Sequence, residues 1–341
     1  MLDKEHLVAD LRGYAVDYTI GVGTVGQGLW VSYNSGGKFR HIPRGVEAES
    51  NCRAMAVSPH QPGRILASQD RVGVFCSDDN GGTWERMGNQ IDSDIWSLAF
   101  DPHDPDRIYV GTRPGIWRSS DGGQSFAPLE TSIAASCPIG VPRTTNVIVD
   151  PDDPMKVWAS VEVNGVHRST DGGETWTALP QLGPSEFHDD VHGFTIRQTD
   201  SGPELMATTP FGLARSRDDG QTWDWHEFGG FPGTKFEFAY SRCVREPWGD
   251  GTVLVCVGDY IPGMVGAVEV SRDGGASWSR ADLPVTPNST MYWLASNVDL
   301  PGVAVATSVF GQVYVTDDHA ESWRKLDRDF GEIRALSLTP G

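Results

Sequence analysis

The chain has 341 residues, and its 46 Asp and Glu residues against 27 Lys and Arg residues give a formal net charge of −19 at pH 7. These charges are spread without a run of one sign, which argues against nucleic acid or an anionic membrane as a partner. The 40 glycines, 22 prolines and 12 tryptophans suit many short strands joined by turns, so an all-β fold is favoured.

Residues 1–18 interleave acids and bases and contain no apolar run of signal-peptide length. No stretch approaches the roughly 20 apolar residues of a transmembrane helix. The five cysteines lack a C-x-x-C spacing and fit reduced core thiols. The sequence therefore predicts a cytoplasmic protein without a membrane partner.

In chain order, the first predicted strands are 18–24, 28–33 and 38–43, which form the second, third and fourth strands of a four-stranded unit. Residues 93–130 contain a complete unit, with strand-like runs at 95–100, 107–112, 115–120 and 125–130 separated by Asp-, Pro- and Gly-rich turns. The run at 332–340 resembles the first strands of the other units. We therefore expect the last strand to complete the first unit and to close a ring.

One octet recurs through these units, as in SDDNGGTW, SSDGGQSF and STDGGETW. The seven copies begin at Ser32, Ser77, Ser119, Ser169, Ser216, Ser271 and Thr316. The Ser and Asp side chains can hydrogen-bond within their own loop, and the glycine can adopt a positive φ. We interpret the octet as a staple of the fold, with its final Trp or Phe packed between neighbouring units.

These octets resemble the Asp-box, or BNR, repeats of sialidases, sortilin-type receptors, xyloglucan-hydrolysing propellers and photosystem II stability factor-like proteins. The resemblance implies a β-propeller, and with seven copies it implies seven four-stranded antiparallel blades in a single domain over residues 1–341. It leaves the function open, because these families include both glycosidases and binding modules.

In a propeller, the first strand of each blade lines the central channel. Alignment of these strands places one residue per blade at the same level, namely Arg53, Trp96, Thr145, His192, Ser241, Tyr292 and Arg334. Two positions earlier the same alignment gives Asn51, Asp94, Arg143, Asp190, Ala239, Thr290 and Glu332. So many polar residues on inner strands predict a ligand site at the channel mouth.

Arg53 and Arg334 would be neighbours, and two guanidinium groups suit an anionic ligand. The alternative is an ion-pair belt, in which these arginines bind Glu332, Asp94, Glu47 or Glu49. Trp96 would stack on a sugar or an aromatic ring. Tyr260 and Arg113 lie in loops between the second and third strands, where they would form the wall of a funnel above the channel. Glu162, in another loop of this kind, is a further candidate for this wall.

The stretch EFHDDVHGF places His188, Asp190 and His192 on one side of an extended chain, where they could hold a metal or a substrate. The alternatives are a loop histidine with a hydrogen-bonded channel histidine, or a general acid or base at His192.

The leading hypothesis is a glycosidase-like hydrolase or lyase that acts on a small anionic substrate or saccharide. Its acid and base would come from His192, Asp190, Asp94 or Glu332. Resemblance to sialidases implies Tyr292 as nucleophile and a carboxylate bound by Arg53, Arg334 and either Arg143 or Arg242. The missing F-R-I-P motif and the seven blades argue against a true sialidase.

Two further hypotheses stay open. The first is a non-catalytic protein-binding or assembly module. The second is a metal-dependent hydrolase or lyase that uses His188 and His192, and it alone predicts a cofactor, a divalent metal.

Overall fold

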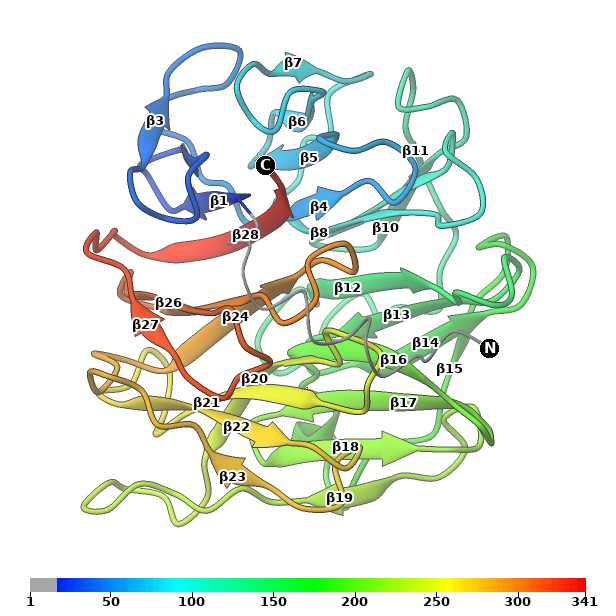
Figure 1. Cartoon of the computed structure of the whole chain (residues 1–341). Coiled ribbons are helices and arrows are strands. Elements are labelled where there is room, and N and C mark those ends of the chain that lie inside the picture. Colours follow the sequence, from blue (N-terminus) through cyan, green and yellow to red (C-terminus); the bar gives the residue numbers. More distant parts are fainter. Residues whose placement is uncertain (1–16) are drawn as a thin grey trace, which may run out of the picture.

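The computed structural model describes residues 17–341, which form seven four-stranded antiparallel sheets (Figure 1). The innermost strands contact one another in a closed cycle, in the order β4, β8, β12, β16, β20, β24 and β28. The prediction of a seven-bladed all-β propeller is therefore confirmed. Residues 1–16, which the single-domain prediction also covers, lie outside the described residues.

Each blade starts at the channel with its innermost strand and continues outward to its edge strand. Blade one contains β28 (Ile333–Pro340), β1 (Tyr18–Thr24), β2 (Leu29–Ser32) and β3 (Arg40–Ile42). Blade two contains β4 (Met55–Val57), β5 (Ile65–Gln69), β6 (Gly73–Ser77) and β7 (Glu85–Arg86), and blade three β8 (Ile95–Phe100), β9 (Ile108–Thr112), β10 (Ile116–Ser119) and β11 (Ala127–Pro128). Blade four contains β12 (Thr144–Val149), β13 (Val157–Val161), β14 (Gly165–Ser169) and β15 (Thr177–Ala178).

Blade five contains β16 (Gly193–Thr199), β17 (Gly202–Thr209), β18 (Gly212–Ser216) and β19 (Asp224–His226). Blade six contains β20 (Tyr240–Arg245), β21 (Val253–Gly258), β22 (Gly266–Ser271) and β23 (Ser279–Arg280), and blade seven β24 (Met291–Ser296), β25 (Ala304–Ser308), β26 (Val313–Thr316) and β27 (Arg324–Lys325). A short 3-10 helix, η2 (Glu186–Asp189), precedes β16. Within residues 17–341 we find no helix with the length and apolar composition that a membrane crossing requires.

The ring closes where the two ends of the described chain meet. Strand β28 pairs with β1 from Tyr18↔Pro340 to Thr24↔Ile333, so the blue and red strands lie side by side in Figure 1. This is the predicted closure. It covers the inner edge of β1, where another chain could otherwise add a strand.

Burial follows the position of a strand within its blade. The second strands are buried along their whole length, as in β5 and β13, except for the first two residues of β17, because neighbouring blades cover both faces of each sheet. The outermost strands are two or three residues long, and β7, β11, β15 and β23 are exposed. Short exposed edges limit pairing between molecules.

The Asp-box octet forms a hydrogen-bonded turn. In the copy at Ser77, the hydroxyl donates to Asp79 Oδ1 and accepts from the Gly81 N–H, each at 2.8 Å. Asp79 accepts from the backbone and the hydroxyl of Thr83, also at 2.8 Å. Gly81 has a φ of 85°, and Trp84 is buried in the core between blades one and two. The staple interpretation is confirmed.

The same hydrogen bonds lower the pKa of the Asp carboxyl groups in these turns. The hydroxyl four residues after each Asp is the main donor, and it lowers the pKa of Asp121, Asp171, Asp218 and Asp273 to about 2. These carboxylates are therefore bound as anions by their own loops. They serve the turn rather than a ligand.

A buried acid connects blade five to blade six. The Glu204 side chain is 2% exposed and forms ion pairs with Arg197 at 3.1 Å and with Arg215 and Arg217 at 2.9 Å. Arg215 also donates to the carbonyl of Gly275, in the Asp-box of blade six, at 2.6 Å. One carboxylate thus organises the contact between two blades.

Candidate functional site

Five inner strands are interrupted at the same level of the channel. In each of these strands, the register of pairing with the second strand of the blade shifts by one residue, which forms a β-bulge. The unpaired residues are Trp96, Thr145, Arg242, Tyr292 and Arg334. A bulge leaves one residue unpaired and redirects its side chain. In blade six the residue at this level is Arg242, so the alignment that placed Ser241 there is wrong by one position.

Two aromatic rings at this level each lie between two arginines. Arg53 and Arg143 stand 5.0 Å and 4.7 Å from the ring centroid of Trp96. Arg242 and Arg334 stand 4.2 Å and 4.7 Å from that of Tyr292 and donate to its hydroxyl. Cation–π contacts of this kind fix the guanidinium planes around the mouth. The predicted roles of Trp96 as a stacking ring and Tyr292 as a nucleophile stay predictions.

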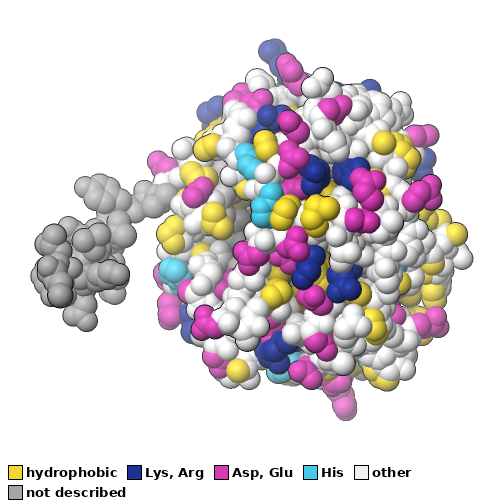
Figure 2. All heavy atoms as spheres, turned by 90° about the vertical axis from the view of Figure 1, so that its right-hand side faces the viewer, with side chains coloured by type: hydrophobic (Ala, Val, Ile, Leu, Met, Phe, Trp, Pro, Cys, Tyr) yellow, Lys and Arg dark blue, Asp and Glu magenta, His cyan; other side chains and the backbone are white. Residues whose placement is uncertain are grey.

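Most of these arginines are paired with a carboxylate. Arg53 contacts Asp70 at 2.7 Å and Arg143 contacts Glu162 at 2.5 Å, while Arg334 pairs with Glu332. The alternative of an ion-pair belt is therefore partly realised, with different partners for Arg53. Acidic and basic side chains accordingly alternate on the face shown in Figure 2.

Arg242 and Asp94 depart from this pattern. Arg242 is 6% exposed, its Nε has no hydrogen-bond partner, and no carboxylate of the described residues lies within ion-pair distance. Asp94 pairs with the exposed Arg71 at 3.5 Å. Within residues 17–341 the channel mouth therefore retains one cation without an ion pair, at Arg242.

An acid cluster lies between blades four and five. One oxygen each of Glu162 and Asp190 and one ring nitrogen of His192 lie within 4.8 Å of one another. His192 Nδ1 lies 3.0 Å from the carbonyl of Ser241, which can only accept, so this nitrogen carries the proton. Nε2 then faces Asp190 Oδ2 at 3.3 Å and the Tyr240 hydroxyl at 3.3 Å.

The electrostatics of this cluster favour an ionised Asp190. Burial opposes its ionisation, but His192, Arg242 and Arg143 outweigh burial and lower the pKa of the carboxyl. Its Oδ1 is buried without a hydrogen-bond partner. Asp190 is thus an anion with one free oxygen, which suits a base or a nucleophile.

The predicted metal set is not brought together. His188 belongs to η2, so the expected alternation of an extended chain does not apply. Its ring stacks on Phe211 at 4.6 Å and meets Trp225 edge-on at 5.0 Å. Glu162, Asp190 and His192 present the donor types of a metal site, but Arg143 already holds Glu162 and Arg242 adds positive charge beside Asp190.

An aromatic wall rises from the acid cluster over blades five and six. Tyr240 packs 5.2 Å from the His192 ring, and Tyr260 lies 6.2 Å from Tyr240 and 5.7 Å from Phe236. Tyr260 is 54% exposed, as its place in the predicted funnel requires. Arg113, the other funnel candidate, donates to the carbonyl of Val141 at 3.2 Å and holds a loop of blade four.

The sequence pointed to Asp190, His192 and Arg143 as site residues. It gave Glu162 only as a candidate for the funnel wall and Arg242 only as an alternative to Arg143. The signal for Glu162 was its position in the loop between the second and third strands, directly above the inner strand of its blade. Arg242 was missed because one residue fewer separates it from the turn after its strand than in blades three and four. The cavity among Arg53, Trp96, Trp293 and Arg334 has a volume of about 90 Å³.

Comparison with known proteins supports the assignment of the octet as an Asp-box repeat. The model of the BNR/Asp-box repeat matches residues 167–178. A probable oligoxyloglucan-reducing end-specific xyloglucanase of Neosartorya fischeri is 26% identical over an alignment 292 residues long, and the match covers 70% of this chain and 35% of that protein. A xyloglucanase of Paenibacillus sp is 23% identical over 67% of this chain and 26% of that protein. The chain thus spans about a third of the length of the first relative and about a quarter of the length of the second.

Solved structures share the fold at low identity. An ancestral GH74 enzyme superposes with a TM-score of 0.62 and 15% identity over 96% of this chain and 40% of that one. YCF48 from Cyanidioschyzon merolae superposes with a TM-score of 0.60 and 14% identity over 86% of this chain and 96% of that one. The chain is a seven-bladed β-propeller of the BNR/Asp-box repeat type.

Proposed function

We propose that this chain is a glycosidase-like hydrolase whose reacting groups are Asp190, Glu162 and His192 at the channel mouth. The observation that carries the proposal is the convergence of these three side chains within 4.8 Å beside an exposed aromatic wall. Aromatic faces suit sugar rings, and paired carboxyl groups suit cleavage of a glycosidic bond. Similarity to xyloglucanases supports the same class of reaction.

The geometry suggests a role for each group. Asp190, held as an anion, would attack the anomeric carbon through its free Oδ1 as the glycosidic C–O bond breaks, and the departing sugar oxygen would take a proton from His192 Nε2. Water would then hydrolyse the glycosyl ester, releasing Asp190 and returning the proton to His192. Glu162 would be the second carboxyl group, and the short separation favours a retaining over an inverting mechanism, whose carboxyl groups stand roughly 6.5–9.5 Å apart. His192 Nε2 would carry a proton next to Asp190. Arg242 is the group that would bind an anionic substituent of the substrate, if the substrate has one.

The test is product analysis by anion-exchange chromatography after incubation with xyloglucan oligosaccharides, cello-oligosaccharides and uronate-containing oligosaccharides. We expect cleavage of at least one of them and a loss of about a thousandfold in kcat for Asp190→Asn, as for removal of an essential catalytic group. Asp200→Asn, in an exposed turn between β16 and β17, is the matched control. No cleavage of any glycoside, or full activity of Asp190→Asn, would overturn the proposal.

A second candidate, a non-catalytic binding module, is favoured by the small cavity and the paired arginines. A volume of about 90 Å³ is below the range of roughly 300–1,000 Å³ typical of ligand pockets. A structure described as YCF48 bound to D1 peptide shares the fold, with a TM-score of 0.54 and 16% identity over 84% of each chain. Calorimetry that detects an oligosaccharide or a peptide, without any product in the chromatogram, would favour this candidate.

The cytoplasmic location rests on the sequence alone and stays a prediction, which cell fractionation tests.

A further inference from the structure

A second cavity adjoins the first one below the arginine level, and the two share Ser97, Leu98, Asn146 and Arg245 in their linings. Its volume is about 350 Å³, and 10 of its 13 lining residues are apolar, among them Pro59, Phe100 and Ile148. These residues come from the ends of the inner strands of blades two, three and four. This volume lies within the range of small-molecule pockets, and the acid cluster does not contribute to the lining.

Arg245, at the end of β20 in blade six, is the charged residue of this lining. Its Nη1 donates to the carbonyls of Val244 at 2.9 Å and Phe194 at 3.3 Å. These carbonyls fix the guanidinium without neutralising it, and among the described residues no carboxylate lies within ion-pair distance of Arg245. Its Nε and Nη2 donate no hydrogen bond within residues 17–341. Removing a cation from water beside apolar walls costs free energy unless an anion binds to it.

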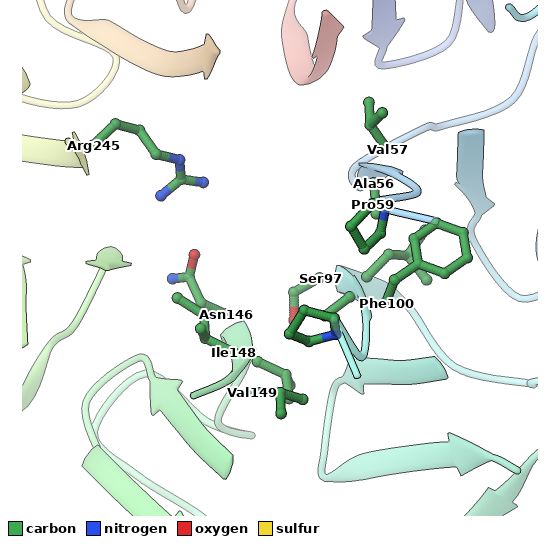
Figure 3. Close-up of a pocket in the computed structure, with 13 residues that line it drawn as sticks. Ala56, Val57, Pro59, Ser97, Phe100, Asn146, Ile148, Val149 and Arg245 are labelled. Carbon is green, nitrogen blue, oxygen red and sulfur yellow. The ribbon is translucent and has the colours of Figure 1, made fainter. Parts of the chain in front are cut away.

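The side-chain donors of the other two polar lining residues have partners, whereas Asn146 Oδ1 accepts no hydrogen bond within residues 17–341. Ser97 Oγ donates to the carbonyl of Thr144 at 2.9 Å, and the Asn146 amide donates to Ser160 Oγ at 2.9 Å. Figure 3 shows Arg245 extending across the cavity toward Asn146, opposite the apolar side chains of Pro59 and Phe100. The cavity therefore offers one cluster of free donors, on Arg245, and an apolar wall facing it.

We propose that this lower cavity binds a small monocarboxylic acid with an apolar body, the carboxylate on Arg245 and the hydrocarbon against blades two to four. A carboxylate matches the two free donors of the guanidinium edge, and the charge-assisted bonds compensate its desolvation. Contact between the hydrocarbon and the apolar wall removes both surfaces from water and so contributes favourably to the free energy of binding. This site is separate from the reacting groups of the proposed hydrolase and does not depend on that function.

The test is isothermal titration calorimetry of the purified chain with octanoate, with octan-1-ol as the uncharged ligand of similar shape. We expect octanoate to bind, and Arg245→Met to weaken it by about tenfold or more, because the variant keeps the aliphatic stem and removes the charge. Arg272→Met is the matched control, since Arg272 also donates to two backbone carbonyls but lies on the outer surface.

A second variant tests the apolar wall without touching the charge. Ala99→Phe fills the space beside Phe100, so we expect it to abolish octanoate binding while urea denaturation shows a folded protein. Failure of octanoate to bind the wild type, equal binding by Arg245→Met, or equal binding of octanol would each overturn the proposal.

Discussion

Replacement of Glu204 by Gln is expected to lower the free energy of unfolding by about 3 kcal/mol. The Glu204 side chain is 2% exposed and contacts three arginines. Arg197 and Arg215 have side chains that are 21% and 14% exposed, so the substitution leaves two partly buried cations without their anion. Arg217 is 56% exposed and adds little, because water screens its charge.

The assay is urea unfolding followed by tryptophan fluorescence, with the free energy obtained by linear extrapolation. Glu174→Gln is the matched control, since Glu174 contacts Arg118 at 2.6 Å but its side chain is 64% exposed. We expect less than about 1 kcal/mol for this control. A loss below about 1 kcal/mol for Glu204→Gln, or equal losses for the two variants, would refute the reasoning that burial gives this ion-pair cluster its effect.

Two further predictions concern the Asp-box turns. Ser169→Ala should cost about 2 kcal/mol, because it removes the acceptor of the buried Gly173 N–H, at 2.8 Å, and leaves that group unsatisfied. Urea unfolding checks this against Ser201→Ala in an exposed turn, and equal stability of the two variants would contradict it. The box carboxylates, with pKa values lowered to about 2, should contribute stability above pH 4 that is lost progressively as the pH falls toward 2. Thermal unfolding between pH 2 and 6 measures this, and a flat profile over that range would count against it.

The fold was predictable because its signals are local and repeated. Each blade carries the same turn, which places a hydroxyl, a side-chain oxygen of Asp or Asn and, except in blade seven, a glycine at fixed spacing. The closure by β28 was also visible, since the three strand-like runs at the start lacked a first strand. Ala320 shows how far the turn tolerates change, because it adopts a φ of 63° where other copies have glycine.

The site was predictable only where side-chain direction follows simple alternation. Trp96 and Thr145 lie five residues before the Asp of their Asp-Pro turns, but Arg242 lies only four residues before Glu246 of the Glu-Pro turn in blade six, so counting from the turn gave Ser241 instead. The position of the His188 side chain was also predicted wrongly, because His188 lies in the 3-10 helix η2 rather than in an extended chain. The pairing of Arg53 with Asp70, and the absence of such a partner for Arg242 among residues 17–341, depend on distances across blades that sequence spacing does not encode.

The pairing of β28 with β1 also bears on how the protein is made. Strands β1, β2 and β3 leave the ribosome before the rest of the propeller, yet their sheet receives its innermost strand only after Ile333–Pro340 has been synthesised. Throughout that interval the edge of β1 presents unpaired backbone groups to other nascent chains. Blade one is therefore the first sheet to begin forming and the last to receive its innermost strand.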